Sequence, residues 1–242
     1  MNPILLIPAR MASARLPGKP LAGIAGVPMI VRVWARAVAA GLGPVVVAAG
    51  ESEIVAAVAK AGGHAVLTDP ALPSGSDRIW AALIAADPKG THDVVVNLQG
   101  DLPALDPEQL KTVVAALAKS DADIATLAAP IDNEPDRINP AVVKAVVAWD
   151  ADERLGQALY FTRTTAPGGE GTLYHHVGLY AYRRVALERF VALPPSPLEM
   201  RENLEQLRAL EAGMRIAVAR VDEAPLSVDT PADLEKARKL LS

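Results

Sequence analysis

Short apolar runs that recur along the chain limit the folds open to it more than any other feature of the sequence. Each run consists of neighbouring apolar residues rather than alternating apolar and polar ones, so we expect its residues to be buried on both faces of a sheet. The runs lie at 4–7, 44–49, 93–98, 123–128, 142–149, 176–182 and 215–221. They predict an α/β, Rossmann-like fold in which helices flank a mixed, mostly parallel sheet. From about residue 123 onward we expect additional antiparallel strands.

Helical patterns lie between several of these runs. Asp106 can cap a helix over 107–120, where apolar residues recur at spacings of three and four. A second helix is predicted over 53–61, because two glycines follow it. Thr230 and the proline after it are typical of the start of a helix and predict the last one. We interpret the proline-rich segment 191–200 as a rigid connection between elements.

Composition narrows the class of protein. A chain of 242 residues with 51% hydrophobic content can bury one large core, so we expect a single domain over 1–242. The net charge of −4 argues against nucleic acid and anionic membranes as partners. The absence of cysteine excludes disulfides, thiolate metal sites and a cysteine nucleophile. The first apolar run is too short for a signal peptide or a membrane span, and we expect a soluble cytoplasmic protein.

The segment after the first predicted strand carries three cations, Arg10, Arg15 and Lys19, among small residues and prolines. In open α/β sheets ligands bind at the carboxyl ends of the strands, where this segment begins. Neither the Walker A pattern nor the dinucleotide pattern G-x-G-x-x-G fits the chain. Two or three Arg and Lys side chains suit a nucleoside triphosphate, since one Mg²⁺ offsets only part of its charge. The alternative is that the three are ordinary surface cations.

Two carboxylates follow later predicted strands. Asp101 comes just after the run 93–98, and Asp229 immediately precedes the last helix. Mg²⁺ prefers hard oxygen ligands from few protein groups, with phosphate and water completing its shell. Taken singly, Asp101 could simply form a turn and Asp229 could simply cap a helix. Together with the upstream cations, the pair favours a metal site.

Seven segments, in order along nearly the whole chain, carry a resemblance to a known family. They are IPARMASARLPGKPL at 7–21, SGSDR at 74–78, NLQGD at 97–101, HVGLYAYRR at 176–184, PPSPLE at 194–199, LEQLRALEAG at 204–213 and VDTPADLE at 228–235. These segments resemble the 3-deoxy-manno-octulosonate (Kdo) cytidylyltransferase family. The resemblance implies a nucleotide-diphospho-sugar-transferase-like fold and a homodimer, with 123–215 contributing the sugar site and dimer contacts. It further implies transfer of CMP from CTP to the anomeric hydroxyl of Kdo with Mg²⁺, giving CMP-Kdo and pyrophosphate for lipopolysaccharide biosynthesis.

The same resemblance implies a role for each matching residue. Catalytic roles fall to Arg15, Lys19, Asp101 and Asp229, of which Asp101 and Asp229 would hold Mg²⁺. The nucleotide would contact Pro8, Ala9, Arg10, Arg15, Lys19, Ser74, Gly75 and Gln99. The sugar acid would contact Arg78, Gln99, His176, Tyr180, Glu205 and Gln206.

Several alternatives stay open at this point. His176 could be a structural histidine, Tyr180 could pack in the core, and Glu205 and Gln206 could lie on a solvated helix face. Leu102 stands where the family usually has an acidic or amide residue, and the segment 163–176 is shorter than the family's loop. The substrate could therefore be a related acid such as 8-amino-Kdo or, more remotely, a sialic acid. A catalytically silent nucleotide-binding protein is the alternative from another class.

Overall fold

The chain packs as two compact units. The structure, a computed structural model, describes residues 1–13 and 15–242. Unit 1 comprises Met1–Lys111 and Pro225–Ser242, and unit 2 comprises Thr112–Ala224. The C-terminal segment thus returns to the unit that the first part of the chain builds. The single domain over 1–242 stays a prediction.

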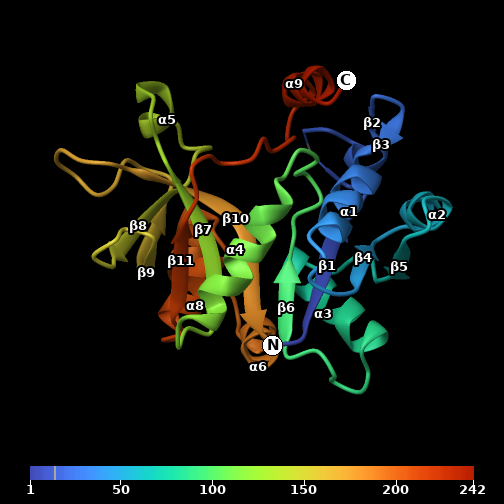
Figure 1. Ribbon diagram of the computed structural model, residues 1–242, viewed down its shortest axis with the longest axis horizontal. Coiled ribbons are helices and arrows are strands. Elements are labelled where there is room, and N and C mark those ends of the chain that lie inside the picture. The colour runs from blue at the N-terminus through green and yellow to red at the C-terminus, as the bar shows by residue number, and fades with distance from the viewer. Residues whose placement is uncertain (14) are drawn as a thin grey trace. The chain divides into compact units, whose positions relative to one another are not determined.

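Four parallel strands form the sheet of unit 1. In the order of the sheet they are β5 (His64–Leu67), β4 (Val45–Ala49), β1 (Pro3–Ala9) and β6 (Val94–Asn97). Figure 1 shows β1 between its two neighbours. The residues of β4 and β6 are all buried, as their continuous apolar runs predict. Because the strands are parallel, their carboxyl ends lie along one edge, and the loops that begin there meet.

Helices pack against this sheet. They are α1 (Met29–Ala39), α2 (Ser52–Lys60) and α3 (Gly75–Ala86). The right-handedness of β-helix-β connections places α1 and α2 on one face of the sheet and α3 on the other. A short 3₁₀ helix, η1 (Lys19–Leu21), and a small hairpin of β2 (Gly23–Ile24) and β3 (Val27–Pro28) lie between β1 and α1.

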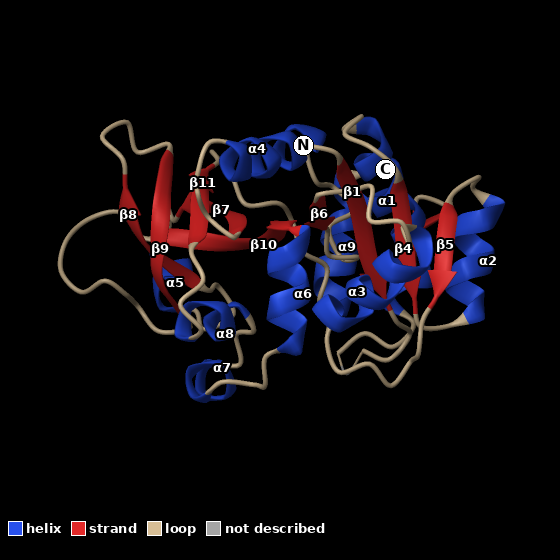
Figure 2. Ribbon diagram, turned by 90° about the horizontal axis from the view of Figure 1, so that it is seen from below, coloured by secondary structure: helices blue, strands red, loops and turns tan. Residues whose placement is uncertain are grey.

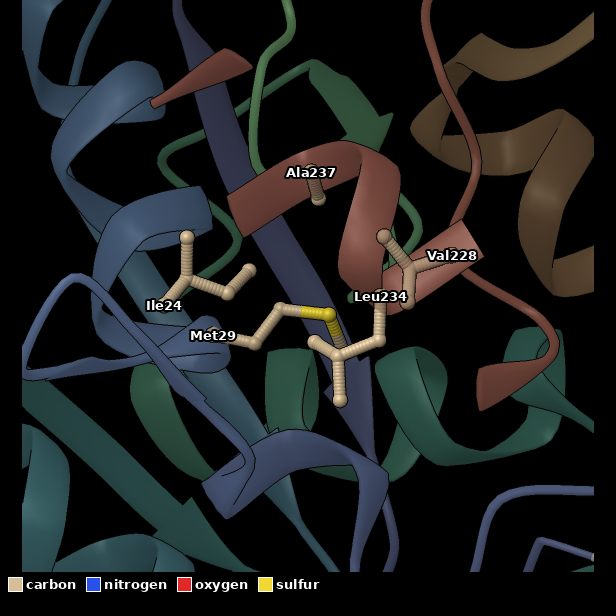
Figure 3. Packing of buried hydrophobic residues seen from close by; sticks show 5 residues of the cluster. All are labelled: Ile24, Met29, Val228, Leu234 and Ala237. Carbon is tan, nitrogen blue, oxygen red and sulfur yellow. The ribbon is translucent and has the colours of Figure 1, made fainter. Parts of the chain in front are cut away.

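The last helix, α9 (Pro231–Leu240), belongs to unit 1. Its Leu234 and Ala237 pack with Val228 against Ile24 and Met29, and all five side chains are buried (Figure 3). Thr230 and Asp233 form a capping box at its start, so the predicted start of this helix is confirmed. The buried cluster holds the segment that carries Asp229 against the segment after β1.

Unit 2 has a mixed sheet whose strands follow the order β10-β7-β11-β9-β8, with a further pairing of β10 with β8 (Figure 2). Only β7 and β11 run parallel, so the expected antiparallel strands are present. The strands are β7 (Ile124–Pro130), β8 (Lys144–Trp149), β9 (Leu155–Thr162), β10 (Tyr174–Arg183) and β11 (Ile216–Arg220).

Short helices accompany this sheet, and one of them corrects the sequence analysis. Unit 2 contains α5 (Glu134–Ile138), α6 (Arg184–Ala192), α7 (Pro197–Glu202) and α8 (Gln206–Glu211), while α4 (Pro107–Ala118) spans the boundary between the units. The segment 191–200 is not only a rigid connection, because α7 begins at Pro197. Ser196 and Glu199 form a capping box there, and proline is favourable in the first turn of a helix.

Among residues 1–13 and 15–242, every helix is too short or too polar to cross a lipid bilayer.

Candidate functional site

Lys19 lies between the two carboxylates that the sequence singles out. Its ammonium donates to Asp101 Oδ2 at 2.9 Å and to Asp229 Oδ1 at 3.2 Å. Gly18, just before Lys19, has a left-handed backbone (φ 70°) that few other residues adopt, and this turn starts η1. The fold therefore brings together three predicted residues that are far apart in the sequence, and all three belong to unit 1.

Backbone contacts fix the positions of the two acidic residues. A Cβ atom at Gly100 would lie 2.8 Å from the carbonyl oxygen of Pro8, so only glycine lets the Asp101 loop approach β1 this closely. The amide of Val228 donates to the carbonyl of Asp101 at 2.9 Å. The loops that carry Asp101 and Asp229 are thus hydrogen-bonded to each other.

The charges of this cluster determine how Lys19 titrates. Burial alone would lower the pKa of the Lys19 ammonium, but the charges and hydrogen bonds of Asp101 and then Asp229 outweigh burial and raise it. The Lys19 side chain is only 16% exposed. Lys19 is therefore a firmly protonated cation held between two carboxylates.

The acid pair fits a divalent cation. Asp101 and Asp229 already hold one cation between them, and their oxygens are the ligands that Mg²⁺ prefers. Within the described part of the chain, no cluster of three or more His, Cys, Asp or Glu residues could supply a metal cage. A Mg²⁺ ion at Asp101 and Asp229 would therefore take its other ligands from phosphate and water, and it would compete with Lys19 for both carboxylates.

The other two loop cations are more exposed. The guanidinium of Arg15 lies 3.3 Å from Asp229 Oδ1, but its side chain is 63% exposed, so this ion pair contributes little to stability. Arg10 is exposed directly after β1, and the next residue, Met11, donates its amide to Glu51. Both arginines are accessible to an anionic ligand at the carboxyl edge of the sheet.

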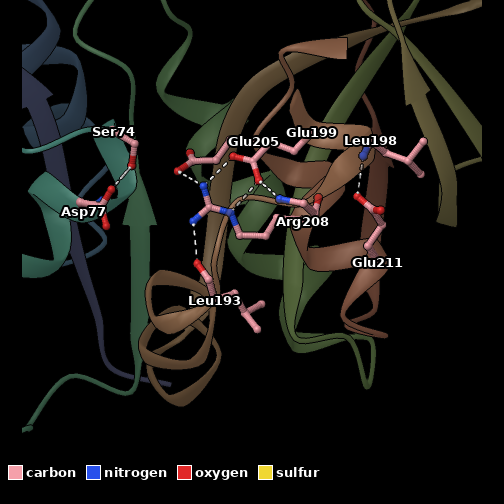
Figure 4. A network of polar contacts seen from close by, with 9 residues as sticks. Ser74, Asp77, Leu193, Leu198, Glu199, Glu205, Arg208 and Glu211 are labelled. Atoms are coloured by element: carbon pink, nitrogen blue, oxygen red, sulfur yellow. Dashed lines mark hydrogen bonds and ion pairs between the residues drawn. The ribbon is translucent and has the colours of Figure 1, made fainter. Parts of the chain in front are cut away.

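Three of the predicted nucleotide contacts converge at the same edge. A Cβ atom at Gly75 would lie 3.4 Å from the Pro8 ring and 3.8 Å from the amide oxygen of Gln99. Ser74 caps α3: its hydroxyl donates to the Asp77 carboxylate at 2.7 Å and accepts from the Asp77 amide (Figure 4). Ala9, which ends β1, is buried. The arrangement offers a ligand the backbone of Gly75 and the amide of Gln99.

Arg78 has a different environment from the one that the resemblance implies. Its guanidinium is buried in unit 1 and donates to Thr68 Oγ1 at 2.7 Å, to Asp69 O at 3.0 Å and to Pro70 O at 3.3 Å. Burial, followed by the charge of Arg10, lowers its pKa. In this structure Arg78 therefore holds the loop before α3, and its contact with a sugar carboxylate stays a prediction.

Four of the predicted sugar contacts gather in unit 2. His176 Nε2 lies 3.1 Å from Thr126 Oγ1, and Gln206 Nε2 lies 3.5 Å from His176 Nδ1. The ring centroids of His176 and Tyr180 are 5.5 Å apart. Gln206 is buried rather than on a solvated helix face, so that alternative is wrong for this residue. Glu205 precedes it at the start of α8.

The imidazole of His176, at the centre of this group, carries no charge at physiological pH. Burial, followed by the neighbouring His175, lowers the pKa of His176 to about 3, so its imidazole is neutral at physiological pH. The hydroxyl of Thr126 donates to the carbonyl of Val177 or Leu179, and its oxygen can then accept from Nε2–H of His176. Nδ1 is thereby left to accept from Gln206.

The sequence analysis missed two residues next to this group. Arg208 lies one turn after Glu205, and its guanidinium forms a two-pronged contact with Glu199. The signal for Glu199 was present in the capping-box pattern S-x-x-E at 196–199. Nothing in the sequence indicated that Arg208 would be its partner.

The chain is similar to known cytidylyltransferases. A profile described as Cytidylyltransferase matches residues 4–216. A curated relative from Parvibaculum lavamentivorans, 3-deoxy-manno-octulosonate cytidylyltransferase, is 66% identical over 100% of this chain and 93% of its own. A relative of the same name from Paramagnetospirillum magneticum is 61% identical over 100% of this chain and 98% of its own.

Solved structures give the same result. The structure of a CMP:2-keto-3-deoxy-manno-octonic acid synthetase complexed with CTP matches with a TM-score of 0.90 and 38% identity, covering 99% of this chain and 98% of that one. A nucleotidyl transferase from Methanothermobacter matches with a TM-score of 0.64 at 15% identity, covering 99% of this chain and 97% of its own, which shows likeness of fold alone.

Proposed function

Because this chain belongs to the cytidylyltransferase family, and within it to the 3-deoxy-manno-octulosonate cytidylyltransferases, we propose that it transfers CMP from CTP to the anomeric hydroxyl of Kdo. The products are CMP-Kdo, for lipopolysaccharide biosynthesis, and pyrophosphate. The observation that carries this proposal is the convergence of Lys19, Asp101 and Asp229 at the carboxyl edge of the parallel strands. Cations and carboxylates together are what transfer of a nucleotidyl group requires.

The reaction needs positioning and charge neutralisation more than covalent help from the protein. The hydroxyl of Kdo attacks the α-phosphorus of CTP while the bond to the pyrophosphate breaks, and the two oxygens are in line. Arg10, Arg15 and Lys19 face the triphosphate in this proposal. Lys19 is a compact charge on a flexible stem, so it can follow the negative charge that develops on the departing pyrophosphate.

Asp101 and Asp229 would hold Mg²⁺. When bound, the ion would supply positive charge to the phosphates and act as a Lewis acid. If the acid pair held Mg²⁺, the Lys19 ammonium that it now binds would be free to contact phosphate oxygens. Asp101 and Asp229 would thus be able to bind either the Lys19 ammonium or a divalent cation.

The remaining residues recognise the two substrates. We assign the nucleotide to Pro8, Ala9, Ser74, Gly75 and Gln99, where close approach of the backbone can read cytosine. We assign hydroxyl groups of the sugar acid to Gln99, His176, Tyr180, Glu205 and Gln206. A two-pronged contact of Arg78 with the Kdo carboxylate requires its guanidinium to leave the carbonyls of Asp69 and Pro70.

We also propose a cytoplasmic homodimer with contacts from 123–215. Light scattering after size-exclusion chromatography should give twice the mass of the 25.3 kDa chain. The mass of a single chain would contradict this part of the proposal.

The proposed reaction is tested by measuring pyrophosphate release from CTP and Mg²⁺, with and without Kdo. We expect release that depends on Kdo. Parallel reactions with 8-amino-Kdo and N-acetylneuraminate test which acid is the substrate. Equal or better use of either would mean that the assignment of Kdo is wrong and that the proposed CMP transfer still holds. Release with none of the acids would favour the silent nucleotide-binding protein. Retention of all three loop cations and both acidic residues argues against that alternative.

A further inference from the structure

Arg208 is shared between two carboxylates in unit 2. It donates from Nε to Glu199 Oε2 at 2.8 Å and from one terminal nitrogen to Glu199 Oε1 at 2.5 Å. The same terminal nitrogen lies 3.8 Å from Glu205 Oε1, and the other donates to the carbonyl of Leu193 at 3.3 Å (Figure 4). Its guanidinium also lies 5.1 Å from the centroid of the Phe190 ring. Arg208 is therefore fixed from several directions.

The two carboxylates are held by Arg208 in different ways. The contact with Glu199 is short and two-pronged, and both side chains are nearly buried, with 9% and 13% exposure. Such a contact fixes orientation as well as charge. At 3.8 Å this nitrogen of Arg208 is too far from Glu205 Oε1 for a hydrogen bond. The contact therefore places a positive charge near the Glu205 carboxylate without directing it as a hydrogen bond would.

Glu199 in turn ties Arg208 to the start of α7. Its carboxylate accepts from the amide of Ser196 at 3.0 Å in the capping box of that helix. A second contact joins the same two helices, because the amide of Leu198 donates to Glu211 at 3.0 Å. The first turn of α8, which carries Glu205 and Gln206, is thus anchored to α7 through Arg208 and Glu199.

We propose that Arg208 is a positioning residue for the sugar site: it ties the first turn of α8, with Glu205 and Gln206, to α7 and places a positive charge near the Glu205 carboxylate. This inference rests on the proposed function, in which Glu205 accepts hydroxyl groups of the sugar acid. In this proposal Arg208 does not itself contact the substrate. Because it acts through Glu205, its removal should weaken the binding of the sugar acid and leave the binding of CTP unchanged.

The test is steady-state kinetics with Kdo and CTP varied separately. Arg208→Gln should raise KM for Kdo at least about tenfold, the effect expected when a contact to a charged group is lost, and change KM for CTP less than about twofold. Arg208→Lys keeps the charge without the fork and should fall between the wild type and Arg208→Gln. Arg208→Gln leaves the Glu199 carboxylate without its guanidinium partner. The double variant Glu199→Gln/Arg208→Gln removes both charges of this pair, and it should show the same increase in KM for Kdo.

A double-mutant cycle separates positioning from a purely structural role. In a Glu205→Gln background, Arg208→Gln should change KM for Kdo by less than about twofold. Arg189→Gln is the matched control, since Arg189 is an exposed arginine that donates to the carbonyl of Ala212 at the end of the same helix. Its kinetics should equal those of the wild type.

Three outcomes would overturn the positioning role. These are equal changes in both KM values, an unchanged KM for Kdo in the charge-neutral double variant, and a full effect of Arg208→Gln without Glu205. A wild-type protein that releases no pyrophosphate with any acid contradicts the proposed function itself. If it uses another sugar acid, the cycle is measured with that acid, and only the proposed substrate is wrong.

Discussion

Taken alone, Asp101 could form a turn, Asp229 could cap a helix and Lys19 could be a surface cation. These roles do not explain why the three side chains meet. The sequence placed Asp101 and Asp229 after strands, and it placed Lys19 in a cationic loop, but it could not show that one ammonium bridges both carboxylates. That contact depends on three loops meeting, which no local pattern encodes. The pKa of Lys19, raised despite burial, is the physical expression of the arrangement.

Asp101→Asn and Asp229→Asn should each lower turnover by at least about 10²-fold, because each removes an anionic metal ligand. Turnover is measured as Kdo-dependent pyrophosphate release at saturating Mg²⁺, and circular dichroism checks that the variants fold. Asp152→Asn, an exposed aspartate between β8 and β9, is the control and should retain the wild-type rate. Near-normal rates in Asp101→Asn or Asp229→Asn would refute the metal assignment.

His176 predicts how stability depends on pH. Its pKa is about 3 in the folded protein, against about 6.5 for an ordinary histidine. Between these values the unfolded chain holds a proton that the folded chain does not. Linkage then lowers the free energy of unfolding as pH falls from about 6.5 towards 3, by up to about 1.4 kcal/mol per pH unit from this residue.

His176→Asn should remove that part of the pH dependence, as measured by urea unfolding at a series of pH values. His64→Asn, a change at an exposed histidine on β5, controls for the loss of a histidine as such. Equal slopes for wild type and His176→Asn would contradict the buried neutral imidazole.

At the scale of elements, the sequence predicted the strands that consist of continuous apolar runs. The runs at 44–49 and 93–98 became β4 and β6, whose residues are all buried. β5 was missed because it lies at the edge of its sheet and none of its residues is fully buried, so it has no continuous apolar run. β9 was missed because a glycine and a glutamine interrupt its apolar residues.

Leu234 tests what holds α9 to the rest of unit 1. Leu234→Ala should lower the free energy of unfolding by about 3 kcal/mol, because it leaves a cavity among Ile24, Met29 and Val228. Leu240→Ala, on the same helix but 63% exposed, should cost less than about 0.5 kcal/mol. Urea unfolding measures both. Equal losses would mean that the buried cluster does not anchor the helix.

For the molecule as a whole, the order of residues along the chain is a poor guide to the site. Unit 1 takes its first part from Met1–Lys111 and its last from Pro225–Ser242. The return of the chain places Asp229 beside Lys19, although 210 residues separate them. A resemblance to the family implied that both residues act together, whereas patterns within the sequence could only place Lys19 in a cationic loop and Asp229 before a helix. The strand that the sequence suggested just before Asp229 is absent, because β11 ends at Arg220.

Because Pro225–Ser242 completes unit 1, we can predict the behaviour of a chain that lacks it. Deleting 225–242 removes Asp229 and three of the five side chains of the buried cluster, which exposes Ile24 and Met29. The chain 1–224 should therefore lose both turnover and stability, seen as a lower urea midpoint or as aggregation. Full-length Asp229→Asn separates the two losses, since it removes the carboxylate and keeps the packing. A shortened chain as stable as the full one would mean that unit 1 is complete without its C-terminal segment, and the buried cluster would then serve only to position Asp229.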